Sequence, residues 1–208
     1  MTETFLTIPA MFALHEGRYA RALDIFERDI LRSGNPRSAM TDGTALLWRV
    51  KLDGASEQPL PWRSLADLAE KVSRPGFLFG EVHAAFAYAA CGDEAALAKM
   101  MDGLRALGAK GHPIAASVVL PLVQGTAAFA AGDHAGALRL FEPIEAEMHR
   151  IGGSHAQWEI YEETMVQCYL ALERHDDATR LVRRRLARRA SPRDRQWLAR
   201  AGAGTGGH

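Results

Sequence analysis

The chain has 208 residues, with 25 basic and 25 acidic side chains and a formal net charge of zero when histidine is neutral. This length suits one large domain or two small ones, and an apolar content of 48% is ample for a hydrophobic core. Zero net charge disfavours a dedicated nucleic-acid-binding or membrane-surface protein. Two cysteines, Cys91 and Cys168, exclude a disulfide-rich scaffold and a cysteine-based zinc ribbon, and they suit the reducing cytoplasm.

The N-terminal ten residues have no basic segment and carry an acid at Glu3, so a signal peptide is not expected. The stretch 113–131 has no charged residue, but many of its apolar residues are alanines. A membrane span needs about 20 strongly apolar residues. We therefore expect a helix buried among other helices, and a soluble, cytoplasmic protein with no membrane partner.

Four segments share one pattern, in which an apolar helical run meets a short break and a second amphipathic helix follows. The breaks fall at Gly17, Gly92, Gly132 and Glu173. Glycine at such a position ends the first helix in a left-handed conformation. Because the second helix begins within a few residues, the two helices must pack antiparallel. Each segment therefore predicts a helical hairpin.

The gap between the first two breaks is about twice the gaps between the later ones, and it holds a further predicted hairpin. Its helices are expected over 38–52 and 62–72, on either side of a loop through Pro59 and Pro61. The whole chain then contains about ten helices in five hairpins. Repeats of about 34 to 47 residues with this pattern indicate a helical solenoid.

Two positions in each unit have a packing role. A small residue five positions after the break lets the second helix approach the first closely, and an aromatic residue four positions further fills the space between hairpins; these are Ala22, Ala137 and Ala178, then Phe26 and Phe141. Five further residues are expected in the core or on a groove wall, namely Leu46, Trp48, Phe86, Phe129 and Tyr169. We predict an all-α solenoid in one domain over 1–200 and a disordered Gly-rich tail over 201–208.

Particular motifs carry a family resemblance. The pattern Gly-Arg-Tyr-x-x-Ala-Leu-x-x-Phe at 17–26 and the pattern Gly-Asp-x-x-x-Ala-Leu-x-x-Phe at 132–141 are similar to the turn of tetratricopeptide repeats. The order of three longer segments resembles the C-terminal half of the tetratricopeptide repeat protein 38 family, over about residues 11–198; these segments are 46–52, 80–87 and 148–157.

This resemblance implies a right-handed superhelix of tetratricopeptide type. The first helix of each hairpin would line a concave groove, and the second helices would form the outside. No established chemistry accompanies the family, so the resemblance implies a fold and a binding role only.

The predicted first helix, over residues 5–14, is apolar nearly all round. The end of a solenoid normally carries a polar capping face, because each hairpin buries its apolar side on the next. Either the chain is a fragment of a longer protein, or this helix packs against a second subunit. We predict self-association through the N-terminal hairpin.

The segment 149–157 is the most informative stretch for function. Two glycines, Gly152 and Gly153, stop one helix. Ser154 begins the next helix, and Gln157, three residues further on, completes a capping box. These four residues have a structural explanation that needs no ligand.

Three other side chains of the segment, His149, Arg150 and His155, surround the predicted helix start. The backbone amides and the dipole at such a place suit a carboxylate or a phosphate group. A site for an anion or an acidic peptide therefore stays open beside the structural explanation.

A metal site would need ligands on one face. His155 and Glu159 are spaced i, i+4, and Glu162 or Glu163 continues the same stripe. His83 lies on an earlier helix, two hairpins away by the repeat count, or about 20 Å from His155 if each hairpin advances about 10 Å. No metal site is expected, and no cofactor is predicted.

The sequence contains no enzyme signature, because the nucleophile elbow, the CxxC pair, the GxGxxG loop and the Walker loop are all missing from it. We expect a non-catalytic scaffold that binds a protein or peptide in its concave groove. The alternative is a small-molecule or anion-binding protein, or an enzyme, that uses the segment 149–155. The candidate ligand- or partner-binding residues are His83, His149, Arg150, Ser154, His155, Gln157 and Glu159.

Charge is segregated at the C-terminal end, because the stretch from Arg180 to Arg200 contains nine arginines and only one acidic residue, Asp194. One interpretation is the exposed face of a capping last helix, whose cations complement the negative end of the helix dipole. The other is a site for RNA or an acidic partner. Because Trp197 is the one aromatic residue among these arginines, binding of nucleic acid is not expected.

Overall fold

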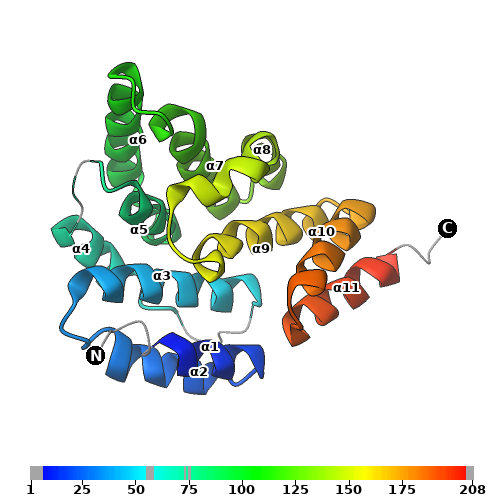
Figure 1. The fold of residues 1–208 in the computed structure, drawn as a ribbon. Coiled ribbons are helices and arrows are strands. Elements are labelled where there is room, and N and C mark those ends of the chain that lie inside the picture. The colour runs from blue at the N-terminus through cyan, green and yellow to red at the C-terminus, as the bar shows by residue number, and fades with distance from the viewer. Residues whose placement is uncertain (1–6, 55–58, 73, 75, 205–208) are drawn as a thin grey trace.

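The computed structural model describes residues 7–54, 59–72, 74 and 76–204, and every regular element in these ranges is helical (Figure 1). They form eleven α-helices, which are α1 (Thr7–His15), α2 (Tyr19–Ile25), α3 (Pro36–Leu52), α4 (Trp62–Val72), α5 (Leu78–Cys91), α6 (Glu94–Ala109), α7 (Leu120–Ala130), α8 (His134–Phe141), α9 (His155–Ala171), α10 (His175–Arg188) and α11 (Pro192–Gly204). Two π-helical turns and a 3₁₀ segment adjoin them, at Phe26–Ile30, Ala115–Val119 and Glu142–Ile151.

Consecutive helices contact each other in five pairs, from α1 with α2 to α9 with α10, and α11 packs on α10. The all-helical prediction is therefore confirmed. The hairpin expected over 38–52 and 62–72 is present as α3 and α4. None of the helices in the described residues has the length and apolar content that crossing a lipid bilayer requires.

The four breaks share one backbone geometry. Gly17, Gly92, Gly132 and Glu173 have φ angles of 72°, 69°, 81° and 57°. In each case the amide of the following residue donates to the carbonyl five positions before it, at 2.8–2.9 Å. These bonds are those of the Schellman motif, which satisfies the last carbonyls of a helix. The glutamate thus adopts the left-handed conformation that the pattern assigns to glycine.

Trp48 of α3 is fully buried. Its ring centroid is 4.6 Å from that of Phe86, 5.5 Å from Phe129 and 6.1 Å from Trp62. Its indole Nε1 donates to Thr164 Oγ1 at 2.9 Å. One side chain thus contacts residues of α4, α5, α7 and α9.

Helix α9 packs directly on α5. The ring of Tyr161 is 5.1 Å from Phe86, and its hydroxyl approaches the carbonyl of Val82 at 3.5 Å. His83 on α5 and His155 on α9 are two hairpins apart in the chain, as predicted, but side chains of the two helices are in contact, which a stack that advances about 10 Å per hairpin does not predict. The chain curves strongly enough to bring α9 back against both α3 and α5.

The packing positions of the repeat pattern are buried, as predicted; these are Ala22, Ala137, Ala178, Phe26 and Phe141. The predicted core residues Leu46, Trp48, Phe86 and Tyr169 are buried too. Phe129 is half-buried, because one side of its ring faces an opening at the end of α7.

The C-terminal end of the helical part differs from the predicted boundary, whereas the predicted N-terminal boundary is not tested. The described part of the first helix begins at Thr7, and residues 5 and 6 lie outside the described residues. On α1, Ile8 is 45% exposed and Phe12 is 64% exposed. Helix α11 continues to Gly204, so the first four residues of the predicted tail are helical, and residues 205–208 lie outside the described residues.

The glutamate in the fourth turn gives a test of the turn geometry. Glu173→Gly should stabilise the protein by about 0.5–1 kcal/mol, because glycine lacks the Cβ that makes positive φ unfavourable. The matched change Gly92→Ala should destabilise it by about 1 kcal/mol, since a Cβ at Gly92 meets nothing within 4 Å and only the backbone conformation is penalised. Urea denaturation measures both free energies of unfolding. Loss of stability in Glu173→Gly would contradict the assignment.

Candidate functional site

His83 is fully enclosed beneath the loop that precedes α9. Its Nδ1–H donates to the carbonyl oxygen of Phe79 at 2.8 Å, because a carbonyl can only accept. Its Nε2 is buried and has no hydrogen-bond partner among the described residues. Burial lowers the pKa of His83 to about 4, so the ring is neutral at pH 7. The imidazole is thus held as a core side chain that carries no charge.

The loop between the 3₁₀ segment and α9 docks on α5 through one aromatic ring. A Cβ added at Gly153, which has φ +78°, would meet the Phe79 ring at 2.3 Å. The centroid of the Phe79 ring is 4.5 Å from that of His83. The structure therefore brings His83 close to the predicted segment, with Phe79 between them, and the glycine is required for this close contact.

The predicted capping box forms at the start of α9. The backbone amide of Ser154 donates to Gln157 Oε1 at 2.8 Å. Ahead of it, His149 Nδ1 donates to the carbonyl of Ala146 at 2.8 Å. These bonds support the structural explanation of the segment.

The charged residues of the segment are engaged as well. The guanidinium of Arg150 pairs with Glu147 at 2.8 Å, and His155 Nδ1 is 3.2 Å from Glu159 Oε1. His155 also lies edge-on to the ring of Trp158, with 4.1 Å between centroids. The side chains that would hold an anion at this helix start are therefore turned to other partners.

Glu159 belongs to a buried ionic cluster that joins α3, α9, α10 and α11, called here the ionic core. It contains the carboxylates of Asp53, Glu159, Glu162, Glu163 and Asp194, and the guanidinium groups of Arg49, Arg185, Arg188, Arg189 and Arg193. Five charges of each sign make the cluster neutral as a whole.

Glu163 is the most connected carboxylate of the ionic core. It is completely buried and lies 2.9 Å from Arg49 Nε, 3.1 Å from Arg185 Nη2 and 3.3 Å from Arg193 Nη1. Burial alone would raise the pKa of Glu163, but the charges of Arg49, Arg193 and Arg185 outweigh it and hold the pKa below its ordinary value. Three helices thus present an arginine to one ionised carboxylate.

Two more contacts fix α11. Arg185 Nε lies 3.1 Å from Asp194 Oδ2, and Arg193 Nε lies 2.8 Å from Asp53 Oδ2 on α3. The guanidinium of Arg193 also lies 4.7 Å from the centroid of the buried Trp197 ring. The last helix is therefore attached to both α3 and α10 by charged side chains that water does not reach.

The ionic core corrects the interpretation of the C-terminal arginines as an exposed face for its own members, whereas Arg180, Arg183, Arg184, Arg195 and Arg200 are exposed as expected. Arg185 is 1% exposed and Arg193 is 3% exposed, and Arg188 and Arg189 pair with buried glutamates. The buried positions could be recognised by register: 159, 162 and 163 on one helix and 185, 188 and 189 on the next have the same i, i+3, i+4 spacing. The glutamates of the first helix of the hairpin and the arginines of the second can then pair with each other.

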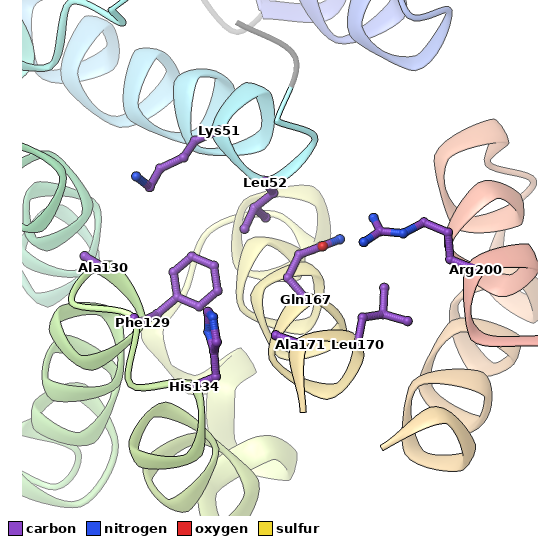
Figure 2. A pocket seen from close by; sticks show the side chains of 10 residues that line it. Lys51, Leu52, Phe129, Ala130, His134, Gln167, Leu170, Ala171 and Arg200 are labelled. Atoms are coloured by element: carbon purple, nitrogen blue, oxygen red, sulfur yellow. The ribbon is translucent and has the colours of Figure 1, made fainter. Parts of the chain in front are cut away.

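An open cavity of about 390 Å³ lies at the C-terminal ends of α3, α7 and α9, beside α11 (Figure 2). Figure 2 shows Lys51 entering from α3 and Arg200 from α11, on opposite sides of Gln167. Ten residues line the cavity, namely Lys51, Leu52, Phe129, Ala130, Gly132, His134, Gln167, Leu170, Ala171 and Arg200. The sequence analysis named Phe129 and Arg200 separately but did not bring the wall together, because its residues come from four distant segments with no common motif.

A second recess, of about 270 Å³, includes the predicted residue His149. Trp158 and two arginine–glutamate pairs complete its wall, in which Arg184 contacts Glu145 and Arg188 contacts Glu162. Because the charges in this wall are already neutralised in pairs, the recess offers no free charge of either sign to a ligand.

The described residues contain no group of three or more His, Cys, Asp or Glu side chains placed to hold a metal ion. Comparison of the sequence with known protein families found no matching family model, and comparison of the structure with solved structures found no significant match.

Removing the charge of Glu163 tests the ionic core. Glu163→Gln should destabilise the protein by about 3 kcal/mol at pH 7, because three buried arginines then share one fewer counter-charge. The wild-type contribution is complete above pH 4.5 and declines as the pH falls below it, since the folded-state pKa is depressed. In urea denaturation the difference between the two proteins should therefore narrow in acid. The control Glu147→Gln removes an exposed pair with Arg150 and should cost less than about 0.5 kcal/mol.

His83 predicts a second pH dependence. The unfolded chain binds a proton near pH 6.5, whereas folded His83 stays neutral down to about pH 4, so wild-type stability falls as the pH drops through this window. The loss attributable to His83 is about 3 kcal/mol. His83→Asn can keep the bond to Phe79 but cannot titrate, and its free energy of unfolding should fall less between pH 7 and 4. Parallel curves for the two proteins would show that His83 is not held neutral.

Proposed function

We propose that the chain is a non-catalytic helical-repeat scaffold of tetratricopeptide type that binds a protein or peptide partner. The observation that carries the proposal is the open cavity where α3, α7, α9 and α11 meet. Three of these are first helices of their hairpins, which are the helices that line the binding surface in an array of this type. The repeated turn geometry and the motifs at 17–26 and 132–141 support the same assignment.

The alternative, a small-molecule site or enzyme centred on the segment 149–155, finds less support. Such a site needs its side chains to converge on an enclosed space. His83 and His149 instead bond to backbone carbonyls, Arg150 pairs with Glu147, and His155 faces Glu159. These residues have structural partners, and the cavity at Lys51 and Arg200 has none of them in its wall.

Self-association through the N-terminal hairpin remains a further prediction. Ile8 and Phe12 are spaced i, i+4 on α1, and both are exposed. A second copy of the chain could bind to this face without contacting the residues that line the cavity.

Selection from a displayed library of random peptides on the immobilised full chain tests the scaffold function. We expect enriched peptides, and Ala171→Trp should weaken their binding about tenfold, because the larger side chain occupies the mouth of the cavity. Ala98→Trp, at an exposed alanine of α6, is the matched control and should change Kd less than twofold.

His149→Ala and His155→Ala should bind the enriched peptides with unchanged Kd, since neither residue lines the cavity. Weaker binding in these two variants would move the binding surface to the 149–155 segment. A selection that enriches no peptide would overturn the scaffold function.

A further inference from the structure

The cavity wall carries an excess of positive charge. Lys51 and Arg200 both line it, and none of its ten residues is Asp or Glu. Neither cation forms an ion pair with a residue that the structure describes. The contrast with the ionic core is sharp, because there each guanidinium has a carboxylate within 4 Å.

Two neutral polar groups of the wall also lack partners. The Nε2 of Gln167 and the Nδ1 of His134 are buried and make no hydrogen bond with the described residues. A buried donor left without an acceptor is energetically unfavourable. An acceptor supplied by a ligand at Gln167 would recover part of that cost. The imidazole of His134 is held in place against Phe129, with 5.3 Å between ring centroids.

The helix ends around the cavity do not cancel this preference. The last carbonyls of a helix carry partial negative charge. In α7, however, the carbonyls of Ala128 and Phe129 accept hydrogen bonds from the following turn at 2.9 and 3.0 Å. In α9 the carbonyls of Tyr169 and Leu170 are bonded in the same way. The two full charges of Lys51 and Arg200 therefore dominate the wall.

We propose that the cavity recognises an acidic segment of the partner, in which separate carboxylates meet Lys51 and Arg200. This proposal rests on the scaffold function and names the chemistry of its ligand. The acidic side chains of the segment neutralise the two cations of the wall. Between them, an amide or carboxylate oxygen of the segment accepts a hydrogen bond from Gln167 Nε2. Phe129, Leu52 and Leu170 supply the apolar surface for the stem of the segment.

The arrangement of the cations favours an extended acidic segment over a single anion. Lys51 and Arg200 enter from opposite sides of the cavity, with Gln167 between them (Figure 2). Two carboxylates of one segment can each meet one of these cations from the two sides of Gln167. An extended chain advances about 3.3 Å per residue, so acidic side chains a few positions apart can meet both.

The peptides enriched on the immobilised chain test this inference by their composition and by charge reversal. We expect them to carry two or more Asp or Glu residues. Lys51→Glu and Arg200→Glu should each weaken their binding about tenfold. Binding to the wild type should weaken as salt is added, since both cations are exposed.

The matched controls are Lys99→Glu on α6 and Arg195→Glu on α11, which change the net charge equally at exposed positions outside the cavity. Both should bind with Kd within about twofold of wild type. Enriched peptides without an excess of Asp and Glu would overturn the inference, and so would wild-type affinity in Lys51→Glu or Arg200→Glu. If Ala171→Trp still blocked peptide binding in either case, the scaffold function would stand. Failure to enrich any peptide would overturn both proposals.

Discussion

The neutrality of the ionic core is the constraint on which the C-terminal half of the structure depends. Glu163 is completely buried and ionised, which is tolerable only because arginines from α3, α10 and α11 surround it. Loss of any one of these helices from the cluster would leave a buried charge without compensation. The cluster therefore fixes the relative position of the helices that contribute to it. Since α11 carries Arg200, the same constraint also places one wall of the cavity.

The turns of the fold could be predicted from the sequence, because their information is local. Glycine after an alanine-rich run predicts a left-handed residue at the end of a helix, and recognising this needs only a few positions of sequence. Glu173 shows how far the pattern extends: the flanking residues imposed the turn even where glycine is missing. The burial of Phe26 and Phe141 followed from the same local register.

The return of α9 to α3 and α5 could not be predicted, because it depends on the curvature accumulated over several hairpins. Small differences in the crossing angle of each helix pair decide whether distant helices touch, and no single residue determines these angles. The burial of Arg185 on α10 was missed for a related reason. Charged residues usually face water, and Arg185 is an exception that becomes visible only when its glutamate partners on α9 are considered together. The capping box of Ser154 and Gln157 was predicted correctly. Nothing in the sequence pointed to Lys51, and Arg200 was noted only as one of the clustered C-terminal arginines.

The bond between Trp48 and Thr164 spans 116 positions of the chain, and the pair of Arg193 with Asp53 spans 140. In an open array each unit touches only its neighbours, so units are gained or lost during evolution with little effect on the remainder. Here the segments on either side of the middle hairpins hold each other. Insertion or deletion of a helix pair between α3 and α9 would break the hydrogen bond from Trp48 to Thr164. It would also separate Arg193 from Asp53. These two contacts therefore fix the length of chain that can lie between α3 and α9 and between α3 and α11.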